Sequence, residues 1–290
     1  MTLLLLLPAL LLLAGVFLWP LLRYAWLSGH ASSVLTGLVA VPNGGANWLR
    51  LASDGRFWQD AWQTLRFAGV SVSLELLLGL ALALALHRQG PGRGLIRGLC
   101  LLPWALPSTL MALGWRWIFN DPYGPINALL QSLDLPAFGF LSSPAITWIF
   151  TVLADVWKTT PFVALLLLAG LQSIPKELEE AIQLEAASRW QQLQRLTLPL
   201  LLPYIGLACL FRLAQAIGVF DLIQVLTAGG PAGSTESLAL YAYLNAMRFL
   251  DFGYSATVML GMFGLLLLLS GLVLLIQRQL AERHGKRGLT

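Results

Sequence analysis

Six long apolar stretches recur along the 290-residue chain and constrain its fold more than any other feature. They cover residues 3–24, 61–86, 95–119, 144–172, 197–226 and 253–277. A helix needs about 20 apolar residues to cross a hydrocarbon core about 30 Å thick. The stretches are far longer than the roughly ten-residue alternating segments of a membrane β-barrel. Because backbone polar groups in lipid must be satisfied internally, we expect an all-α polytopic membrane protein with six transmembrane helices.

Charged residues are scarce, and their distribution predicts the orientation. Only 11% of the residues are charged, against roughly a quarter in soluble domains. Lysine and arginine mark the cytoplasmic connections of a membrane protein. Ten of them fall on one predicted side: Arg88, Arg93, Arg97, Lys176, Arg189, Arg195, Arg278, Arg283, Lys286 and Arg287. Four fall on the other: Arg23, Arg50, Arg56 and Arg248. We therefore expect both termini in the cytoplasm, and we attribute the net charge of +4 to topology and not to a nucleic-acid partner.

The sequence argues against a cofactor or an energy source within the chain. Cys100 and Cys209 lie inside apolar stretches, so we expect no disulfide. His30, His87 and His284 lack metal-ligand spacing, so we expect no metal site. The chain also has no Gly-rich phosphate-binding loop, and no arrangement typical of a membrane-embedded enzyme. Uphill transport by this protein would draw on a bound ion or on another subunit.

The outer connections carry no inserted domain, and we expect one transmembrane domain over residues 1–290. The first apolar stretch lacks a basic flank and a small-residue cleavage site, so we expect a retained span and not a signal peptide. Residues 45–60 form an external amphipathic segment rich in tryptophan, which suits the membrane interface. The loop 120–143 is short and marked by proline and glycine.

A polar amphipathic helix is expected on the cytoplasmic side, over residues 174–195. Glutamates at Glu177, Glu179 and Glu180 complement the dipole at its start. Leu178 and Ala181 belong to a narrow apolar strip at helical spacing. The strip either folds against the protein's own bundle or docks into a cytoplasmic partner, and periodicity alone leaves both open.

Several charged residues fall inside the apolar stretches, where each needs a partner or a water-filled cavity. They are Arg66, Glu75, Arg116, Asp155, Lys158, Arg212 and Asp221. Asp155 and Lys158 have i,i+3 spacing and could neutralise each other; alternatively, they line a translocation path together with Trp157. Arg116 and Arg212 are expected to reach an interface or to bind backbone carbonyls. Phe220 and Asp221 either line the path or, in the case of Asp221, hold the fifth span against a neighbour.

The segment Thr227, Ala228, Gly229, Gly230 and Pro231 is expected to leave helical geometry, because two glycines weaken a helix and proline disfavours α geometry in the residue before it. It is either an ordinary turn or an external loop that receives substrate.

The cytoplasmic segment resembles the coupling-helix motif of permease subunits in ABC importers. That motif begins Glu-Ala-Ala, continues with three residues and then a Gly, and ends in a hydrophobic residue with Leu-Pro. Here Glu180, Ala181, Leu196, Leu198 and Pro199 match it, and Glu185 stands where the family favours Asp. Ile182 replaces the second Ala, and Ala186 replaces the Gly.

Further segments in the same order resemble the carbohydrate-uptake branch of that family, the maltose and glycerol-3-phosphate type. They are Asn47-Trp48, Phe57-Trp58, Leu102 to Pro107, Trp117 to Asn120 with Gly124 and Asn127, Trp157 to Phe162, Phe220-Asp221, and Thr227 to Pro231 with Glu236 and Tyr241. The short loop 120–143 resembles the glycerol-3-phosphate-type architecture more than the maltose type.

The resemblance implies a type I ABC-importer permease fold in a bacterial inner membrane. It implies a second homologous permease, two ATP-binding subunits that hold ATP and Mg²⁺, and an external solute-binding protein that delivers a sugar-like solute. This chain would have no catalytic site. The residues implied for coupling to the ATPase are Glu180, Ala181, Glu185, Ala186, Ala187, Arg189 and Pro199. The main alternative is an ion-coupled secondary transporter, although no inverted repeat is visible. A disaccharide, a polyol glycoside such as glucosylglycerol, and glycerol-3-phosphate all remain open as solutes.

Overall fold

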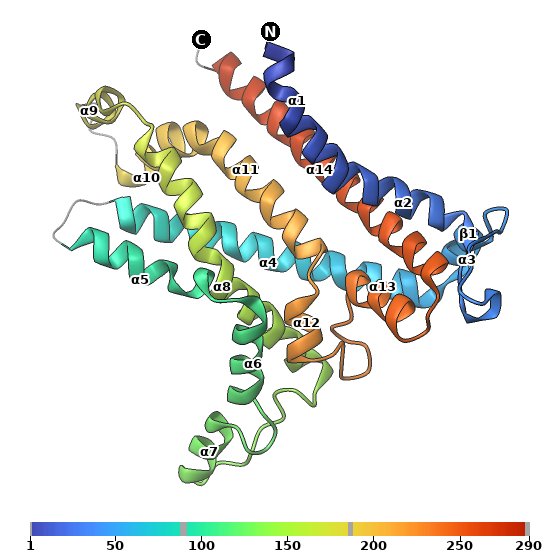
Figure 1. Cartoon of the computed structure of the whole chain (residues 1–290). Helices are drawn as coiled ribbons and strands as arrows, with labels where there is room; N and C mark the ends of the chain where they lie inside the picture. Colours follow the sequence, from blue (N-terminus) through green and yellow to red (C-terminus); the bar gives the residue numbers. More distant parts are fainter. Residues whose placement is uncertain (1, 88–91, 185–187, 288–290) are drawn as a thin grey trace. The chain divides into compact units, whose positions relative to one another are not determined.

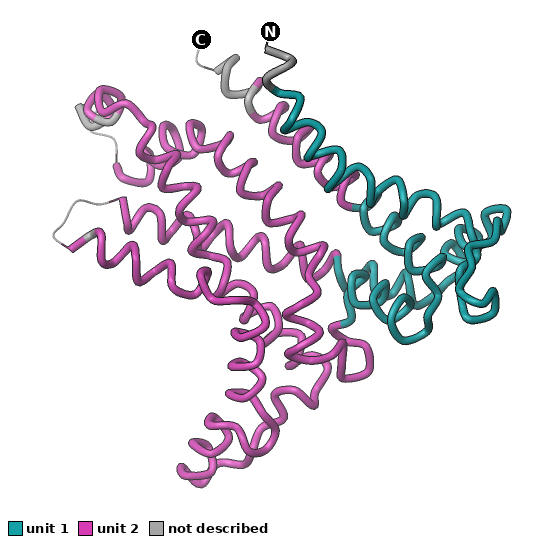
Figure 2. Tube along the Cα trace, in the orientation of Figure 1, with its two compact units in different colours: residues 1–64, 236–265 teal, residues 65–235, 266–290 magenta. Residues whose placement is uncertain are grey.

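The chain is almost entirely helical. The computed structural model describes residues 2–87, 92–184 and 188–287 (Figure 1). Its backbone divides into two compact units: unit 1 comprises residues 1–64 and 236–265, and unit 2 comprises residues 65–235 and 266–290 (Figure 2). Two long helices, α4 (Gly55–His87) and α14 (Phe252–Arg287), contribute to both. The all-α class predicted from the apolar stretches is confirmed.

Unit 1 contains the N-terminal helices and the start of α14. Its elements are α1 (Thr2–Leu13), the π-helical η1 (Ala14–Leu18), α2 (Trp19–Ser28), β1 (His30–Ala31), the 3-10 turn η2 (Val34–Thr36), β2 (Val41–Pro42), α3 (Ala46–Ser53), the first turns of α4, and α13 (Leu238–Met247). β1 and β2 pair antiparallel, with His30 opposite Pro42. Leu51, Phe57, Leu238 and Tyr254 form the centre of its apolar core.

Unit 2 holds the remaining helices. They are α5 (Arg93–Ala105), α6 (Ser108–Ile118), α7 (Pro125–Ser132), α8 (Pro144–Gln172), α9 (Lys176–Leu184), α10 (Arg189–Gln192), the π-helical η3 (Leu193–Thr197), α11 (Leu198–Ile217) and α12 (Asp221–Leu226). Helix α8 leads from the region of α6 and α12 to α9 and α10 (Figure 1).

Glycines allow α8 to approach its neighbours closely. A Cβ on Gly79 would lie 2.6 Å from the Val163 side chain, and one on Gly170 would lie 2.6 Å from the Tyr204 ring. Both glycines therefore face positions where α4 and α11 pack onto α8, beside the buried Leu167.

Five helical segments are long and apolar enough to cross a membrane. They are Leu6–Ser28, Gly55–His87, Pro144–Gln172, Arg189–Ile217 and Phe252–Leu280. A sixth span results if the pair Gly94–Ala105 and Ser108–Ile118 counts as one. The most apolar 18-residue window of the first span and that of the last span contain no buried residue, as expected of helices in contact with lipid or a partner.

Two expected spans are interrupted. The stretch 95–119 is bent by 85° between α5 and α6, at Leu106 and Pro107. The stretch 197–226 breaks after Ile217, and a separate helix, α12, begins at Asp221. Both breaks expose backbone groups in the middle of apolar sequence, and such groups occur at membrane depth only where protein or a polar cavity satisfies them.

Candidate translocation site

The two interruptions border a hollow in unit 2. It has a volume of about 400 Å³ and is lined by residues of α5, α6, α8, α11, α12 and the connection between the last two. Its polar lining consists of Ser108, Asp155, Lys158, Thr159, Arg212, Gln215 and Asp221, and its aromatic lining of Trp104 and Phe220. Four of the expected path residues, Asp155, Lys158, Phe220 and Asp221, are thus brought together. Hydrogen-bonding groups beside aromatic rings suit a small polar ligand.

A buried ion cluster forms one wall of this hollow. The Arg212 guanidinium donates from Nε to Glu75 Oε2 at 2.5 Å, from Nη2 to Glu75 Oε1 at 2.9 Å, and from Nη2 to Asp155 Oδ2 at 2.9 Å. Its Nη1 donates to Gln215 Oε1, and the Thr159 hydroxyl donates to Glu75. Arg212 is 2% exposed and Glu75 is fully buried. The cluster therefore joins α4, α8 and α11 through largely buried charges.

Asp155 and Lys158 attract each other electrostatically, as their spacing suggested, but their direct contacts are with other groups. Asp155 binds Arg212, whereas Lys158 Nζ donates to the carbonyl of Leu106 at 2.6 Å and to that of Trp104 at 3.3 Å. These carbonyls belong to the end of α5, where the bend and Pro107 remove their helical partners. Lys158 therefore caps the C-terminal end of α5, where a positive charge interacts favourably with the helix dipole. The expectation that Arg212 reaches an interface or binds backbone carbonyls is wrong, because its guanidinium is buried and donates to the side chains of Glu75, Asp155 and Gln215.

Other expected positions lie elsewhere. Trp157 does not line the hollow: it is 44% exposed, on another face of α8, with its ring 5.9 Å from that of Trp115. Arg116 donates to the Val225 carbonyl at 3.2 Å, which confirms the expected carbonyl contact. Arg66 lies over the Trp148 ring at 4.3 Å.

The sequence also missed lining residues. Trp104, Ser108 and Gln215 line the hollow without having been expected there. Trp104 belongs to the Leu102 to Pro107 segment that resembles the family, but the sequence does not show that its ring faces the hollow. Glu75 and Arg212 were each recognised as intramembrane charges, and only the fold shows that they are partners.

The segment after α12 leaves helical geometry, as expected from its glycines. Ala228, Gly229 and Ala232 have positive φ, and the Gly230–Pro231 peptide is cis. The Thr227 and Thr235 hydroxyls are 2.8 Å apart, and the Thr235 amide donates to the Gly229 carbonyl. Residues 227–235 thus form a closed, internally bonded loop. Whether this loop receives substrate stays a prediction.

The segment predicted to be cytoplasmic forms two short helices, α9 and α10, in place of the single one expected over 174–195. On α9, Glu180 and Ala181 are exposed, and Leu178 is 43% exposed. Ser188 and Gln191 form a capping box that starts α10, and Arg189 is exposed. Pro199 lies in the first turn of α11. Glu185, Ala186 and Ala187 lie outside the described residues. The apolar strip of α9 is left partly uncovered by unit 2, which favours docking over the folded-back alternative.

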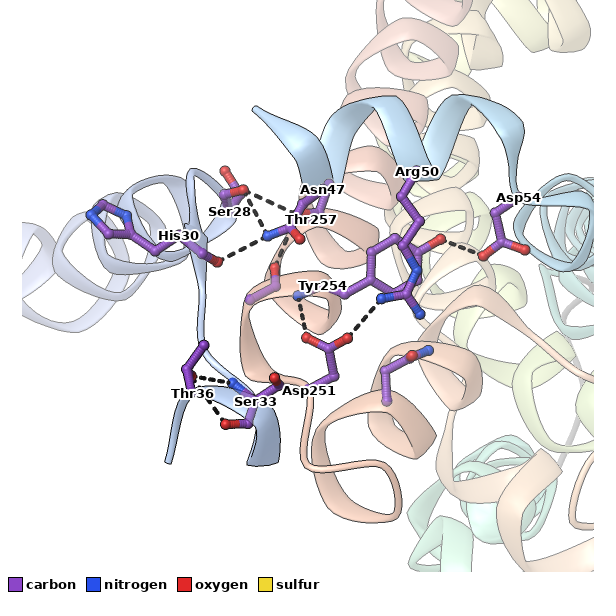
Figure 3. A network of polar contacts seen from close by, with 12 residues as sticks. Ser28, His30, Ser33, Thr36, Asn47, Arg50, Asp54, Asp251, Tyr254 and Thr257 are labelled. Atoms are coloured by element: carbon purple, nitrogen blue, oxygen red, sulfur yellow. Dashed lines mark hydrogen bonds and ion pairs between the residues drawn. The ribbon is translucent and has the colours of Figure 1, made fainter. Parts of the chain in front are cut away.

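A second polar network lies within unit 1 (Figure 3). Arg50 binds Asp251 at 2.8 Å and lies over the Tyr254 ring at 3.7 Å. Tyr241 and Tyr254 both donate to Asp54. The Asn47 amide donates to the carbonyls of Ser28 and His30 and ties α3 to the end of α2.

The pKa values of Asp54 and Tyr241 in this network are shifted. Burial raises the pKa of Asp54, but hydrogen bonds from Tyr241, Tyr254 and the backbone outweigh it, so that the pKa lies below its ordinary value. Burial, together with the hydrogen bond to Asp54, raises the pKa of Tyr241 to about 12. Both shifts favour an ionised Asp54 carboxylate that accepts hydrogen bonds from neutral phenols.

These features describe a multi-pass helical membrane protein with a polar hollow between broken spans and an exposed amphipathic helix between two others. The chain belongs to the family described as binding-protein-dependent transport system inner membrane component, whose model matches residues 75–284. That stretch includes the residues that line the hollow, helices α9 and α10, and the loop 227–235.

Relatives and a solved structure agree with this assignment. The chain is 39% identical over 265 residues to the trehalose/maltose transport system permease protein MalF of Thermococcus litoralis, covering 91% of this chain and 89% of that protein. It is 35% identical over 277 residues to the sulfoquinovosyl glycerol transport system permease protein SmoG of Agrobacterium fabrum, covering 95% and 89%. Its fold matches a chain of a bacterial ABC transporter that imports the acidic polysaccharide alginate, with a TM-score of 0.80 at 20% identity, covering 95% and 94%. The chain is therefore an ABC-transporter permease subunit.

Proposed function

We propose that this subunit carries a sugar or sugar-like solute across the inner membrane through the hollow in unit 2. The observation behind the proposal is the lining itself, in which carboxylate, amide, hydroxyl and ammonium groups surround the Trp104 and Phe220 rings. Sugars offer hydroxyls for such groups and an apolar ring face for aromatic side chains. The printed names of the relatives, a trehalose/maltose permease and a sulfoquinovosyl glycerol permease, support the same class.

The proposal includes the partners implied by the resemblance. A second homologous permease completes the path, an external binding protein delivers the solute, and two ATP-binding subunits hold ATP and Mg²⁺. The ATPases contact the cytoplasmic segment through Glu180, Ala181, Glu185, Ala186, Ala187 and Arg189, with Pro199 starting the span that follows. The partly exposed strip of α9 supports this contact. Both termini are proposed to lie in the cytoplasm.

The path is tested by two tryptophan substitutions in the assembled importer. Trp104→Ala removes an aromatic ring from the hollow, and Trp157→Ala removes one of similar exposure that does not line it. With radiolabelled trehalose as the probe, in proteoliposomes with ATP and binding protein, we expect at least tenfold slower uptake for Trp104→Ala and nearly normal uptake for Trp157→Ala. Equal effects of the two substitutions would rule out the hollow as the path.

The energy source is tested on α9. Glu180→Lys reverses a charge in the motif, and Glu177→Lys reverses one on the same exposed helix outside it. We expect Glu180→Lys to abolish ATP-dependent uptake without loss of membrane insertion, while Glu177→Lys keeps most of it. Normal uptake in Glu180→Lys would contradict the proposed coupling, and uptake that persists with an inactive ATP site would favour an ion-coupled transporter.

A further inference from the structure

We propose that the carboxyl group of Asp60 is a proton-binding site in unit 1 and that it carries its proton in the folded protein at neutral pH. Asp60 lies in the first turns of α4, directly before the apolar stretch 61–86. All residues that form this site belong to unit 1, whereas the hollow is lined by residues of unit 2. The site is therefore independent of the proposed solute path.

Asp60 is enclosed where α4 and α13 are bonded to each other. The residue is 1% exposed. One turn further along α4, the Thr64 hydroxyl donates to the Asp60 backbone carbonyl at 2.7 Å and accepts from the Leu238 amide at 3.0 Å. The Oδ2 atom of Asp60 is buried and has no hydrogen-bond partner among the described residues. An ionised carboxylate here would hold a buried charge on an unpartnered atom, which costs far more than a neutral carboxyl group does.

The cation that acts on Asp60 is committed to another carboxylate. Arg56 attracts Asp60, but its Nη2 donates to both oxygens of Glu236, at 2.7 and 3.0 Å, and its guanidinium lies over the Tyr241 ring. Glu236 and Asp54 both repel a charge on Asp60. Two carboxylates and one cation thus act on this side chain, and a proton on Asp60 removes the repulsion without disturbing the pair of Arg56 with Glu236.

A proton fits this position better than a metal ion or a group from another subunit. Because Oδ2 is buried, a side chain of a partner does not reach it in the folded unit. A metal ion needs several ligands, and the described residues contain no group of three or more histidine, cysteine, aspartate or glutamate side chains placed to hold one. A proton needs no further ligand and leaves a neutral group behind.

The site makes the stability of unit 1 depend on pH. An unfolded chain releases the aspartate proton near its ordinary pKa of about 3.9. If the folded chain keeps the proton at neutral pH, the folded state binds more protons than the unfolded state above about pH 4. Stability then falls as the pH rises from that value, and it levels off where the folded carboxyl group also ionises. Asparagine has nearly the shape of a protonated aspartate and never ionises, so Asp60→Asn should avoid this loss.

The first measurement detects the proton itself. Infrared spectra of the purified, assembled importer in detergent at neutral pH report the C=O stretch of protonated carboxyl groups. We expect a band in the wild type that shifts when aspartate is labelled with carbon-13 and that is missing in Asp60→Asn. Asp251→Asn changes an aspartate of the same unit that binds Arg50 at 2.8 Å, and it should keep the band. Identical bands in the wild type and Asp60→Asn overturn the inference.

The second measurement compares thermal midpoints of the same three proteins across pH. At neutral pH we expect Asp60→Asn to unfold about 3 °C or more above the wild type, and near pH 4 we expect no difference. Asp251→Asn, which loses an ion pair, should show no gain at either pH. No gain in Asp60→Asn at neutral pH, or an equal gain at both pH values, overturns the inference. Failure of Asp60→Asn to assemble, when Asp251→Asn does assemble, overturns it as well, because the carboxylate charge would then be required. Neither readout involves solute uptake, so the proposed path is tested separately.

Discussion

Each of the two units contains a network of charged side chains, and the networks differ in how far water reaches them. In unit 2, Arg212 and Glu75 are 2% and 0% exposed. In unit 1, the arginines of the pairs Arg50–Asp251 and Arg56–Glu236 are 53% and 44% exposed. The residue types and distances are similar. The comparison teaches that burial, and not the count of ion pairs, decides what such a network does for the protein.

The difference follows from desolvation. Exposed ion pairs gain little because water screens them and competes for them. A buried pair holds its geometry because a separated charge would be left without solvent, so its removal costs far more than its formation gains. Unit 1 supplements its pairs with aromatic rings, placing Arg50 and Arg56 over Tyr254 and Tyr241. Unit 2 uses only charge, amide and hydroxyl partners around Arg212.

The sharpest way to break this comparison is Arg212→Met. It leaves Glu75 and Asp155 buried without their cation, and we expect a loss of about 3–5 kcal/mol in stability. Thermal unfolding of the purified complex in detergent measures the loss. The triple variant Glu75→Gln, Asp155→Asn, Arg212→Met serves as the control and should recover most of it, because no buried charge remains. An Arg212→Met protein as stable as the wild type would show that burial does not set the value of this cluster.

Lys158→Met provides an intermediate case. The ammonium is partly exposed, and its removal leaves the Leu106 and Trp104 carbonyls at the bend without their donor. Hydrogen bonds to charged groups contribute about 1.5–3 kcal/mol, so we expect a loss in this range. Lys158→Arg, which keeps the charge, should lose less. The same thermal measurement applies, and equal losses in both variants would argue against the capping role.

Arg56→Ala tests the exposed end of the comparison. Its two contacts with Glu236, at 2.7 and 3.0 Å, have good geometry, but the side chain is 44% exposed. We expect a loss of no more than about 1 kcal/mol that shrinks as salt is added. A double-mutant cycle with Glu236→Gln isolates the pair. A coupling as large as the Arg212 effect would remove the distinction between the two networks.

The fold class could be predicted from the sequence because lipid admits few solutions, and six apolar stretches satisfy one of them. The points at which two of these stretches break, between α5 and α6 and between α11 and α12, could not be predicted in this way. Pro103, Pro161 and Pro203 lie inside continuous helices, whereas Pro107 follows the end of α5. Proline thus occurs both inside helices and at the point where a span breaks. The break at Pro107 also involves a residue distant in the sequence, Lys158, which donates to the carbonyls left without helical partners.

The candidate site was predictable in part for a related reason. Asp155, Lys158, Phe220 and Asp221 stood out as polar or motif residues in apolar sequence, and the fold brings them to one hollow. The partners of these charges did not stand out. Helical spacing suggested Asp155 with Lys158, but Arg212 lies 57 residues from Asp155 and 137 from Glu75 in the chain. Pairs at that separation are set by helix packing, which local periodicity does not encode.

The smallest expected effect appears only at the extremes of pH and sharpens the account of unit 1. The pKa of Tyr241 is raised to about 12 in the fold, against about 10 in an unfolded chain. Between these values the unfolded chain loses a proton that the folded chain keeps, so stability falls as the pH rises from about 10 to 12. The lowered pKa of Asp54 acts at the other end, where its contribution is lost as the pH falls through that value. Thermal midpoints measured against pH should therefore show a smaller alkaline decline in Tyr241→Phe than in the wild type. Tyr243→Phe, on the same helix, should keep the wild-type decline, and identical curves for all three proteins would show that the Tyr241 contact with Asp54 does not contribute to stability.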